Sequence, residues 1–359
     1  MKRVMIIFGL VTLMLVGCMQ KTDETRNQSE DKSMDQVEEA IKVLEVDSDN
    51  FHFIVDWLTD TKVVFVEKDK GKYLLRTFDI TTGKIETLYE ETMIILDVLI
   101  HPSKNTYLLH TSDNSSSATI KIISLEGVVL DEISIASSEL AIEWNDIDPT
   151  QLLLTAFQKD WSFDVFLYSG TEVDIRQLPL EDPFPKWHGR QKIITLNVSE
   201  GPLDGGELLL YDSVLGTQKG LDMKGVVHFD TNGEKLLIVQ INGENADYKI
   251  IDQDGTVLSK WSMPAVSNYS EWVFPEWSWI ADTTIIMPST SEGGRLDDLR
   301  EPFHLVRVAN GRQDVLLGDV PTGILRCSPS GEKCLAGPKA EKIIDLLKQE
   351  EIIWISELD

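Results

Sequence analysis

The chain of 359 residues has no hydrophobic run long enough to span a membrane. The apolar segment at its N-terminus, Val4 to Val16, is 13 residues long, whereas a helix that crosses a bilayer needs about 20. The basic pair Lys2 and Arg3 precedes this segment and the small residue Gly17 follows it. This order is typical of a secretory signal peptide. We therefore expect residues 1–17 to be a signal that is removed, not a transmembrane helix.

The segment Leu15-Val16-Gly17-Cys18 resembles the lipobox of bacterial lipoproteins. The resemblance implies that Cys18 carries a diacylglyceryl group and palmitate and becomes the mature N-terminus. The alternative is an ordinary signal peptide or anchor with an incidental cysteine. After Cys18 the sequence is polar and has no aromatic residue through Gln36, so residues 18–37 are expected to be a lipidated, disordered tether. The folded domain would be 38–359, held at the extracytoplasmic face of a Gram-positive cell membrane.

Positive charge is scarce, because 33 Lys and Arg face 60 Asp and Glu, for a net charge of −27. Loss of Lys2 and Arg3 with the signal lowers the net charge by two, to about −29. Such a field repels phosphate backbones, so nucleic acid is a poor partner. It also keeps the body off anionic lipid, which leaves the lipid on Cys18 as the membrane link. Cations or basic partners would be attracted, although a merely soluble acidic surface explains the charge as well.

Cysteine is rare: besides Cys18 there are only Cys327 and Cys334, in the segment RCSPSGEKC. If Ser330-Gly331 is a two-residue hairpin turn, Cys327 faces Cys334 closely enough for a disulfide. Two buried free thiols are an equally open alternative. No CxxC motif or nearby histidine favours a redox or metal site.

Sharp catalytic motifs are missing as well. The chain has no GxSxG elbow, HExxH helix, Walker loop or GxGxxG turn. We also expect no C-terminal α/β domain of the kind that propeller-capped peptidases have. We therefore expect a protein that is not an enzyme and has no cofactor.

What the chain does have is a repeat, with a spacing near 44 residues between about residues 51 and 320. Each unit contains a glycine hairpin between two strand-like runs, preceded by two more such runs. These preceding runs are FHFIVDW and KVVFVEKD in the first unit, LAIEWN and QLLLTAF in the third, and WVFPEWSW and TTIIMPS in the sixth. The hairpin glycines are Gly83, Gly127, Gly170, Gly216, Gly255 and Gly311. Four short strands per repeat are the signature of β-propeller blades. Asp252 and Asp254, before Gly255, resemble a calcium loop but are expected to cap this turn.

Turns such as HPSKN, DTNGEK and CSPSGEK resemble those of WD40-like and TolB-like propellers. A lipoprotein signal joined to such a body resembles the YqgU-like family of uncharacterised Gram-positive lipoproteins. That resemblance implies six blades, whereas the repeat count predicts about seven. The C-terminal unit shows GILRCSP, KCLAGP and EEIIWISEL but no fourth strand, so the lone strand from Ala40 to Val46 is predicted to complete the last blade and close the ring. A two-domain β-sandwich is the alternative fold.

Inner strands carry polar side chains that a propeller could gather around its channel. These are Asp56, Asp97, Glu143, Lys186, His188, His228, Asp230, Glu276 and Arg326. Carboxylates at a channel mouth could bind Ca²⁺ and support a metal-assisted hydrolase or lactonase. The alternative is that these side chains are solvated or paired strand ends.

Nine tryptophans are present, with a cluster at Trp272, Trp277 and Trp279 that could stack on cell-wall glycan. However, Trp57, Trp144, Trp187 and Trp277 recur late in inner strands, which favours packing between blades. The segment PKAEKIIDLLKQEE has helix-like apolar spacing and is predicted to be a short amphipathic helix.

Connections between second and third strands vary in length, and the largest is STSEGGRLDDLREP in the sixth unit. Insertions on one face of a repeat array often mark its binding face. The candidate binding loop therefore contains Arg295, Asp297, Asp298, Arg300 and Glu301; variable loops without a function are the alternative. The sequence predicts a monomeric, membrane-anchored binding or assembly module for an unknown protein partner, with a hydrolase or a glycan binder as alternatives.

Overall fold

Short apolar and β-branched runs form antiparallel strands in a computed structural model of the chain, which describes residues 40–170, 174–198 and 201–358. The predicted runs FHFIVDW and KVVFVEKD are strands β2 (Phe51–Trp57) and β3 (Lys62–Asp69). Second strands such as β3 contain buried residues on both faces, because each sheet packs between two neighbours. Outer strands are more polar, and all residues of β17 (Thr217–Gly220) are exposed.

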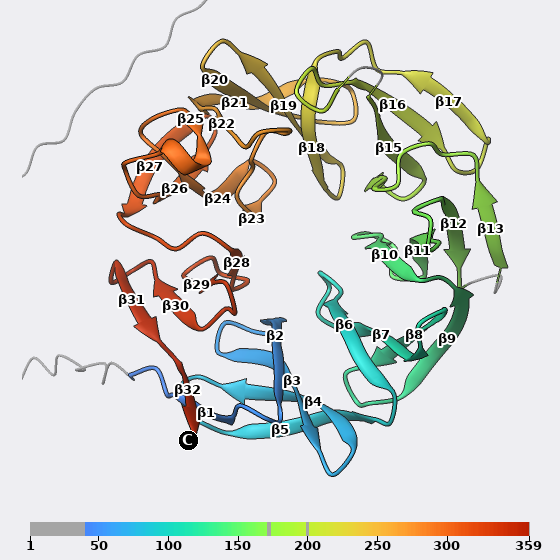
Figure 1. Cartoon of the computed structure of the whole chain (residues 1–359), viewed down its shortest axis with the longest axis vertical. Helices are drawn as coiled ribbons and strands as arrows, with labels where there is room; N and C mark the ends of the chain where they lie inside the picture. Colours follow the sequence, from blue (N-terminus) through green and yellow to red (C-terminus); the bar gives the residue numbers. More distant parts are fainter. Residues whose placement is uncertain (1–39, 171–173, 199–200, 359) are drawn as a thin grey trace, which may run out of the picture. The chain divides into compact units, whose positions relative to one another are not determined.

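Seven four-stranded sheets follow one another along the described residues (Figure 1). The first sheet adds β4 (Lys72–Asp79) and β5 (Ile85–Glu91) to β2 and β3. The second sheet consists of β6 (Ile94–Ile100), β7 (Thr106–Asn114), β8 (Ser117–Ser124) and β9 (Val129–Ala136). The third sheet consists of β10 (Glu139–Trp144), β11 (Gln151–Phe157), β12 (Phe163–Ser169) and β13 (Asp174–Leu178).

The fourth sheet joins β14 (Lys186–His188), β15 (Lys192–Asn197) and β16 (Glu207–Asp212) to β17. The fifth sheet consists of β18 (Val226–Asn232), β19 (Lys235–Asn242), β20 (Asn245–Ile251) and β21 (Val257–Pro264). The sixth sheet consists of β23 (Ser278–Ala281), β24 (Thr284–Ser289), β26 (His304–Ala309) and β27 (Arg312–Leu317). The seventh consists of β28 (Ile324–Cys327), β29 (Lys333–Gly337), β30 (Lys342–Asp345) and β31 (Glu350–Ile353).

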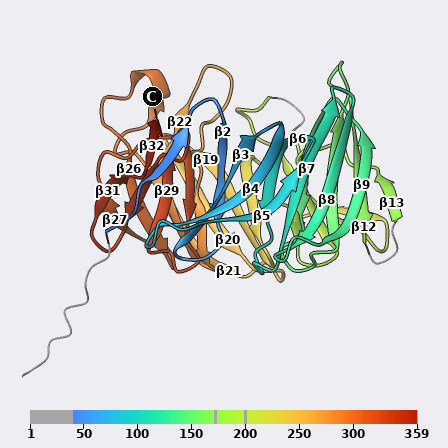
Figure 2. The ribbon, with the colours of Figure 1, turned by 90° about the horizontal axis from the view of Figure 1, so that it is seen from below.

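The seven sheets of the body from Ala40 onward form a ring, which is seen face-on in Figure 1 and from its edge in Figure 2. The first strand of each sheet lies innermost, and β2 contacts both β6 of the next sheet and β28 of the last one. The predicted all-β propeller and its count of seven are therefore confirmed. Within the described ranges, the chain has no helix with the length and hydropathy needed to cross a bilayer.

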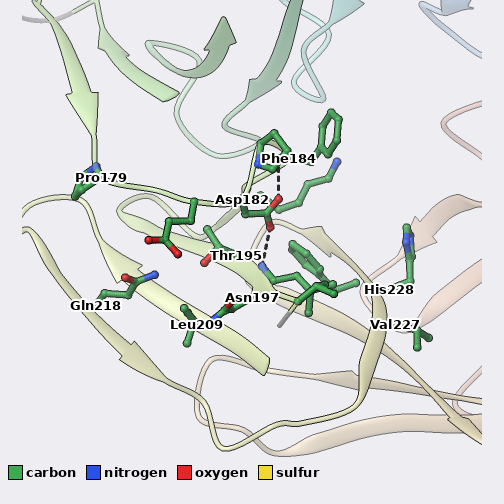
Figure 3. Close-up of a pocket in the computed structure, with 15 residues that line it drawn as sticks. Pro179, Asp182, Phe184, Thr195, Asn197, Leu209, Gln218, Val227 and His228 are labelled. Carbon is green, nitrogen blue, oxygen red and sulfur yellow. Dashed lines mark hydrogen bonds between the residues drawn. The ribbon is translucent and has the colours of Figure 1, made fainter. Parts of the chain in front are cut away.

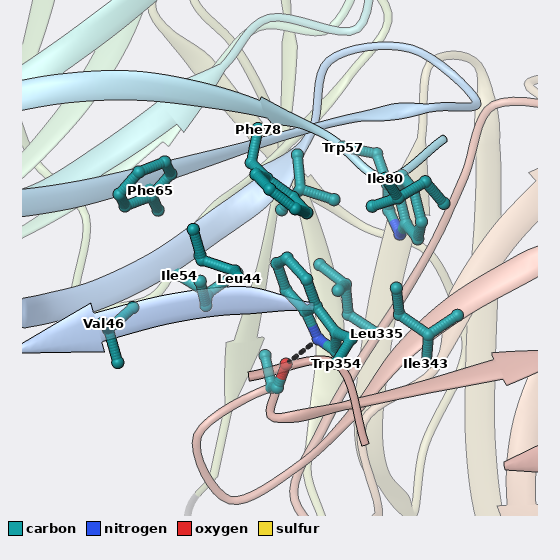
Figure 4. Packing of buried hydrophobic residues seen from close by; sticks show 12 residues of the cluster. Leu44, Val46, Ile54, Trp57, Phe65, Phe78, Ile80, Leu335, Ile343 and Trp354 are labelled. Atoms are coloured by element: carbon teal, nitrogen blue, oxygen red, sulfur yellow. Dashed lines mark hydrogen bonds between the residues drawn. The ribbon is translucent and has the colours of Figure 1, made fainter. Parts of the chain in front are cut away.

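The two ends of the described body meet between the first and last sheets, but not as predicted. Strand β1 (Leu44–Asp47) pairs in parallel with β32 (Ile355–Leu358), and both lie outside the seventh sheet, which has four strands of its own. Leu44 and Trp354 are almost fully buried among residues of the first and last sheets (Figure 4). The indole of Trp354 donates to the carbonyl of Ala340 at 2.8 Å. The N-terminal strand closes the ring by covering this seam instead of completing the last blade.

Two local predictions were wrong. The predicted helix in PKAEKIIDLLKQEE is a hairpin of β30 and β31. Ile343 and Ile344 are both fully buried, so the apolar pair that resembles a helix face fills both sides of a central strand. Most of WVFPEWSW is also irregular, and only Ser278 onward forms β23. Pro275, which has no backbone N–H to donate, lies in the irregular part.

All six glycines lie between paired antiparallel strands, so the hairpin prediction is confirmed, and five of the six have the expected positive φ. These five are Gly83, Gly127, Gly216, Gly255 and Gly311; Gly170 is not among the residues with positive φ. The predicted cap is also present, because Asp252 accepts bonds from the N–H groups of Asp254 and Thr256 at 3.0 and 2.9 Å.

The cysteine hairpin has the register expected from its turn. Cys327 in β28 lies opposite Cys334 in β29, and the structure joins the two in a disulfide. The N–H of Gly331 donates to the carbonyl of Ser328 at 2.7 Å and closes the turn.

Candidate functional site: the channel and the insertion face

Three of the predicted channel residues come together at the centre of the ring. The Nζ atom of Lys186 lies 3.1 Å from Oε2 of Glu143 and 3.8 Å from Oδ1 of Asp230. The other oxygen of Asp230 accepts hydrogen bonds from the indoles of Trp277 and Trp279, at 2.8 and 2.9 Å. The inner strands of three consecutive sheets thus build one polar cluster, in which both oxygens of Asp230 have partners.

The electrostatics of this cluster follow from its enclosure. Burial raises the pKa of Glu143 to about 7, against the opposing effect of Lys186. Burial also raises the pKa of nearby Asp146, whose carboxylate accepts the Gly233 N–H at 3.0 Å. For Lys186, burial opposes the charged form, but the carboxylates of Glu143 and Asp230 outweigh it and raise the pKa. Lys186 therefore stays protonated, and the carboxylates of Glu143 and Asp230 balance its charge, although its side chain is 35% exposed.

Most of the remaining predicted channel residues lie at other places around the ring. Arg326 donates to the carbonyl of Val55, beside Asp56, whose pKa is raised by burial against the nearby cations Lys104 and Arg326. Glu276 accepts from the N–H of Leu325 at 3.3 Å. These groups join neighbouring sheets and do not form one catalytic set.

Asp97 and His188 are likewise apart, whereas His228 lies beside the cluster. The ring of His228 contacts Trp277 with centroids 5.1 Å apart, and its pKa, which burial lowers, also responds to both Asp230 and Lys186. Asp97 accepts the N–H of Val98 at 2.8 Å. The ring of His228 stacks on Phe274 with centroids 4.9 Å apart. His188 is buried, and burial, with Lys192 and Lys235 nearby, lowers its pKa to about 4.

No three or more His, Cys, Asp or Glu side chains among the described residues are grouped so that they could hold a metal ion. The calcium hypothesis for the channel mouth stays a prediction without a ligand set to support it.

The recurrent tryptophans pack as predicted. Trp57, Trp144 and Trp187 are buried. The indoles of Trp57 and Trp187 donate across to the neighbouring sheet, to the carbonyls of Arg326 and Glu143 at 2.9 and 3.3 Å. The tryptophans of the cluster predicted for glycan stacking also pack, because Trp272, Trp277 and Trp279 are partly buried against the core of the fifth and sixth sheets.

The long connections gather on one face of the ring, which we call the insertion face. It is formed by the links between second and third strands and by the links between consecutive sheets. Its largest feature is a pair of loops, residues 265–277 and 290–303, here called the paired loops. Strand β22 (Val266–Ser267) of the first loop pairs with β25 (Gly294–Arg295) of the second. The indole of Trp272 further donates to the carbonyl of Leu203, from the fourth sheet, at 3.0 Å.

The predicted binding residues lie on these paired loops. Arg295 forms an ion pair with Asp298 at 2.9 Å across a short 3₁₀ turn, η1 (Leu296–Asp298). The guanidinium of Arg295 also lies over the ring of Tyr269, 5.4 Å from its centroid. Tyr269 is 77% exposed. The structure thus presents an aromatic ring and a guanidinium together on a braced surface.

The other three predicted loop residues surround this pair. The backbone N–H groups of Arg300 and Glu301 both donate to Oε1 of Glu292, the latter at 3.0 Å. Asp297 is exposed on η1. Their side chains stay at the surface, and the loop is held by backbone bonds and by Glu292.

Sequence reasoning missed a second region of the insertion face. A cavity of about 770 Å³ lies between the fourth and fifth sheets (Figure 3). Phe184, 61% exposed, lines it, and Trp161, 71% exposed, lies one sheet away. The only signals in the sequence are an aromatic residue in the turn KDWS and another between two prolines in PFP.

A closed ring of seven four-stranded antiparallel sheets around a channel defines a β-propeller. The chain belongs to the family of the YqgU-like 6-bladed beta propeller domain, whose model matches residues 79–337. The family description gives six blades, whereas this structure has seven four-stranded sheets.

Among its relatives, the uncharacterized lipoprotein YqgU of Bacillus subtilis (strain 168) is 25% identical over 299 residues, which cover 82% of this chain and 81% of that protein. The crystal structure of the uncharacterized protein lmo1340 from Listeria monocytogenes EGD-e is similar, with a TM-score of 0.82 and 18% identity, over 88% of this chain and 98% of that one. The propeller domain of the Trilobed protease from Pyrococcus furiosus matches with a TM-score of 0.52 and 13% identity, over 86% and 99%. These two structural matches concern the fold alone.

Proposed function

We propose that the protein is a lipid-anchored module at the extracytoplasmic face of the cell membrane, which binds a protein partner through the paired loops. The lipobox-like segment before Cys18 and the naming of the Bacillus relative as a lipoprotein support the anchor. Cys18 and the tether lie outside the described residues. The absence of a catalytic set among the described channel residues makes binding a better explanation than hydrolysis.

The observation that carries this proposal is the exposed pair of Tyr269 and Arg295 on the braced paired loops. Tyrosine and arginine are enriched at the energetic centres of protein interfaces. A surface that is already ordered loses less conformational entropy on binding.

The charge of the paired loops indicates what kind of partner fits. They contain six carboxylates, from Glu271, Glu276, Glu292, Asp297, Asp298 and Glu301, and two guanidinium groups, from Arg295 and Arg300. The net charge of −4 favours a partner with a basic surface and speeds its association at low ionic strength.

Photo-crosslinking in the producing bacterium tests the docking surface. A photoreactive residue replaces Tyr269, and the matched control replaces Leu215, which is 72% exposed in a hairpin of the opposite face. We expect a discrete adduct from position 269 and none from 215. The adduct should be lost when Asp297 and Asp298 are both changed to Lys. Equal adducts from both positions, or none from either, would contradict the proposed surface.

The anchor has a separate test. Labelled palmitate should enter the wild-type protein and not Cys18→Ala, and the variant should leave the membrane fraction. Palmitate incorporation that persists in Cys18→Ala would overturn the assignment.

A further inference from the structure

The second region of the insertion face has the composition of a carbohydrate site. Two large aromatic side chains, Trp161 and Phe184, are 71% and 61% exposed on neighbouring sheets. Phe157 lies between them, with ring centroids 6.3 Å from Trp161 and 5.9 Å from Phe184. The two exposed rings are thus parts of one supported aromatic platform, which offers flat apolar faces to solvent.

The loop that carries Trp161 holds it in an uncommon conformation. Its φ of +66° is in the left-handed region, which bulky residues rarely adopt. The N–H of Trp161 donates to the carbonyl of Gln158 at 3.0 Å, and Asp160 accepts from the hydroxyl of Ser162 at 2.6 Å. Local strain at an exposed, well-braced position is typical of a binding site.

Phe184 is held just as firmly. It lies between Pro183 and Pro185, which fix the neighbouring backbone angles. Asp182 accepts the N–H of Phe184 at 2.9 Å and, through its other oxygen, the N–H of Leu196 at 2.6 Å (Figure 3). The ring therefore has a rigid support at the edge of the 770 Å³ cavity.

The cavity beside Phe184 offers hydrogen-bonding side chains of several kinds. Its polar lining includes Glu181, Thr195, Asn197, Gln218 and His228. Carboxylate, amide, hydroxyl and imidazole groups together can donate to and accept from neighbouring hydroxyls. A volume near 770 Å³ is within the usual range for small-molecule sites.

A second depression, of about 460 Å³, lies on the other side of the Trp161 loop and is lined by Ser138, Gln158 and Asp160 among others. The aromatic platform is therefore flanked by polar hollows on both sides. Such an alternation fits a linear ligand whose units have apolar ring faces and hydroxylated edges.

We propose that Trp161, Phe184 and the adjoining cavity form a binding site for a short neutral oligosaccharide, separate from the paired loops. Neutral sugars are favoured over acidic ones, because Glu181 and Asp182 face the cavity while its cation, Lys186, is already paired with Glu143 and Asp230. The sugar rings stack on the two aromatic faces, and the cavity side chains bind the hydroxyls.

Isothermal titration calorimetry on the soluble body, residues 38–359, tests this site. The probes are neutral hexasaccharides of glucose, of mannose and of N-acetylglucosamine, with a hexasaccharide of galacturonic acid as the acidic comparison. We expect saturable binding of at least one neutral probe, weakened tenfold or more by Trp161→Ala and by Phe184→Ala. Trp161→Phe should retain most of the affinity because it keeps an aromatic face.

The matched control is the variant Leu215→Ala, in which an exposed apolar residue of the opposite face is replaced. This variant should bind the neutral probes as the wild type does. No heat from any neutral probe at millimolar concentration would overturn the proposal. Preference for the acidic probe, or equal affinity in wild type, Trp161→Ala and Phe184→Ala, would overturn it as well. The photo-crosslinking result at Tyr269 is independent of either outcome.

Discussion

At the residue scale, the backbone of Trp161 makes a prediction that does not depend on any ligand. Alanine retains the steric cost of a positive φ, whereas glycine does not. We expect Trp161→Gly to be more stable than Trp161→Ala by about 1 kcal/mol, measured by urea denaturation. At Leu215, which is not among the residues with positive φ, the order should reverse. Trp161→Ala matching or exceeding Trp161→Gly would contradict a left-handed backbone here.

Glu143 predicts a dependence of stability on pH. Its folded-state pKa of about 7 is above the ordinary value of 4.5, so the folded state binds the proton more tightly. The stability that Glu143 contributes to the folded state through its bound proton is fully present below pH 4.5 and is lost as the pH rises through 7. We expect the free energy of unfolding to fall between pH 5 and 8 by about 1–3 kcal/mol from this group. Urea denaturation of wild type and Glu143→Gln at each pH gives the difference between their free energies of unfolding, which isolates the contribution of Glu143. A difference that does not change with pH would refute the prediction.

At the scale of the element, the glycine hairpins differ in how closely they approach the neighbouring sheet. Gly311 has a φ of +80°, and a Cβ there would lie 2.6 Å from the carbonyl oxygen of Lys260 in β21. Gly255 has a φ of +81° and nothing within 4 Å of such a Cβ. We expect Gly255→Ala to cost about 1 kcal/mol from strain alone and Gly311→Ala to cost about 1–3 kcal/mol more from the clash. Equal losses in thermal or urea unfolding would show that the sheets separate freely.

Strands could be predicted from the sequence where the pattern of apolar residues is compatible with only one kind of secondary structure. FHFIVDW, KVVFVEKD and QLLLTAF are strands within the predicted bounds, because β-branched and apolar runs between turns leave little alternative. Ile343-Ile344 was misread, since adjacent apolar residues occur both on a helix face and in a strand buried on both sides. Only the pairing of β30 with β29 distinguishes the two cases, and that pairing is a long-range property.

The candidate site was predictable only in part, for a similar reason. Inner-strand position placed Glu143, Lys186 and Asp230 near the channel, and the structure brings them together. The sequence could not reveal that Trp161 and Phe184 share Phe157 as a support, because the three rings come from different strands and loops. The long insertion of the sixth unit stood out by its length alone, whereas the stacking of Arg295 on Tyr269 needed the fold.

At the scale of the whole molecule, the ring depends on a seam that both ends of the body cover. Strand β32 supplies the hydrogen-bonded partner of β1. Leu44, Trp354 and Phe78 pack there with residues of the first and last sheets. Each sheet otherwise contacts its sequence neighbours, so removing this cover should affect the two sheets at the seam first.

Deleting residues 355–359 tests how the ring is closed. The truncated body should still fold, with a Tm at least 5 °C lower, since β1 loses its partner and apolar residues at the seam become exposed. Hydrogen exchange should rise most in β1 to β4 and in β28 to β31, and least in the third to fifth sheets. Trp354→Ala, which removes a fully buried indole, should have the same regional pattern and cost about 3–5 kcal/mol. If exchange instead rises evenly around all seven sheets, the ring unfolds as one unit, and the seam is no weaker than any other contact between blades.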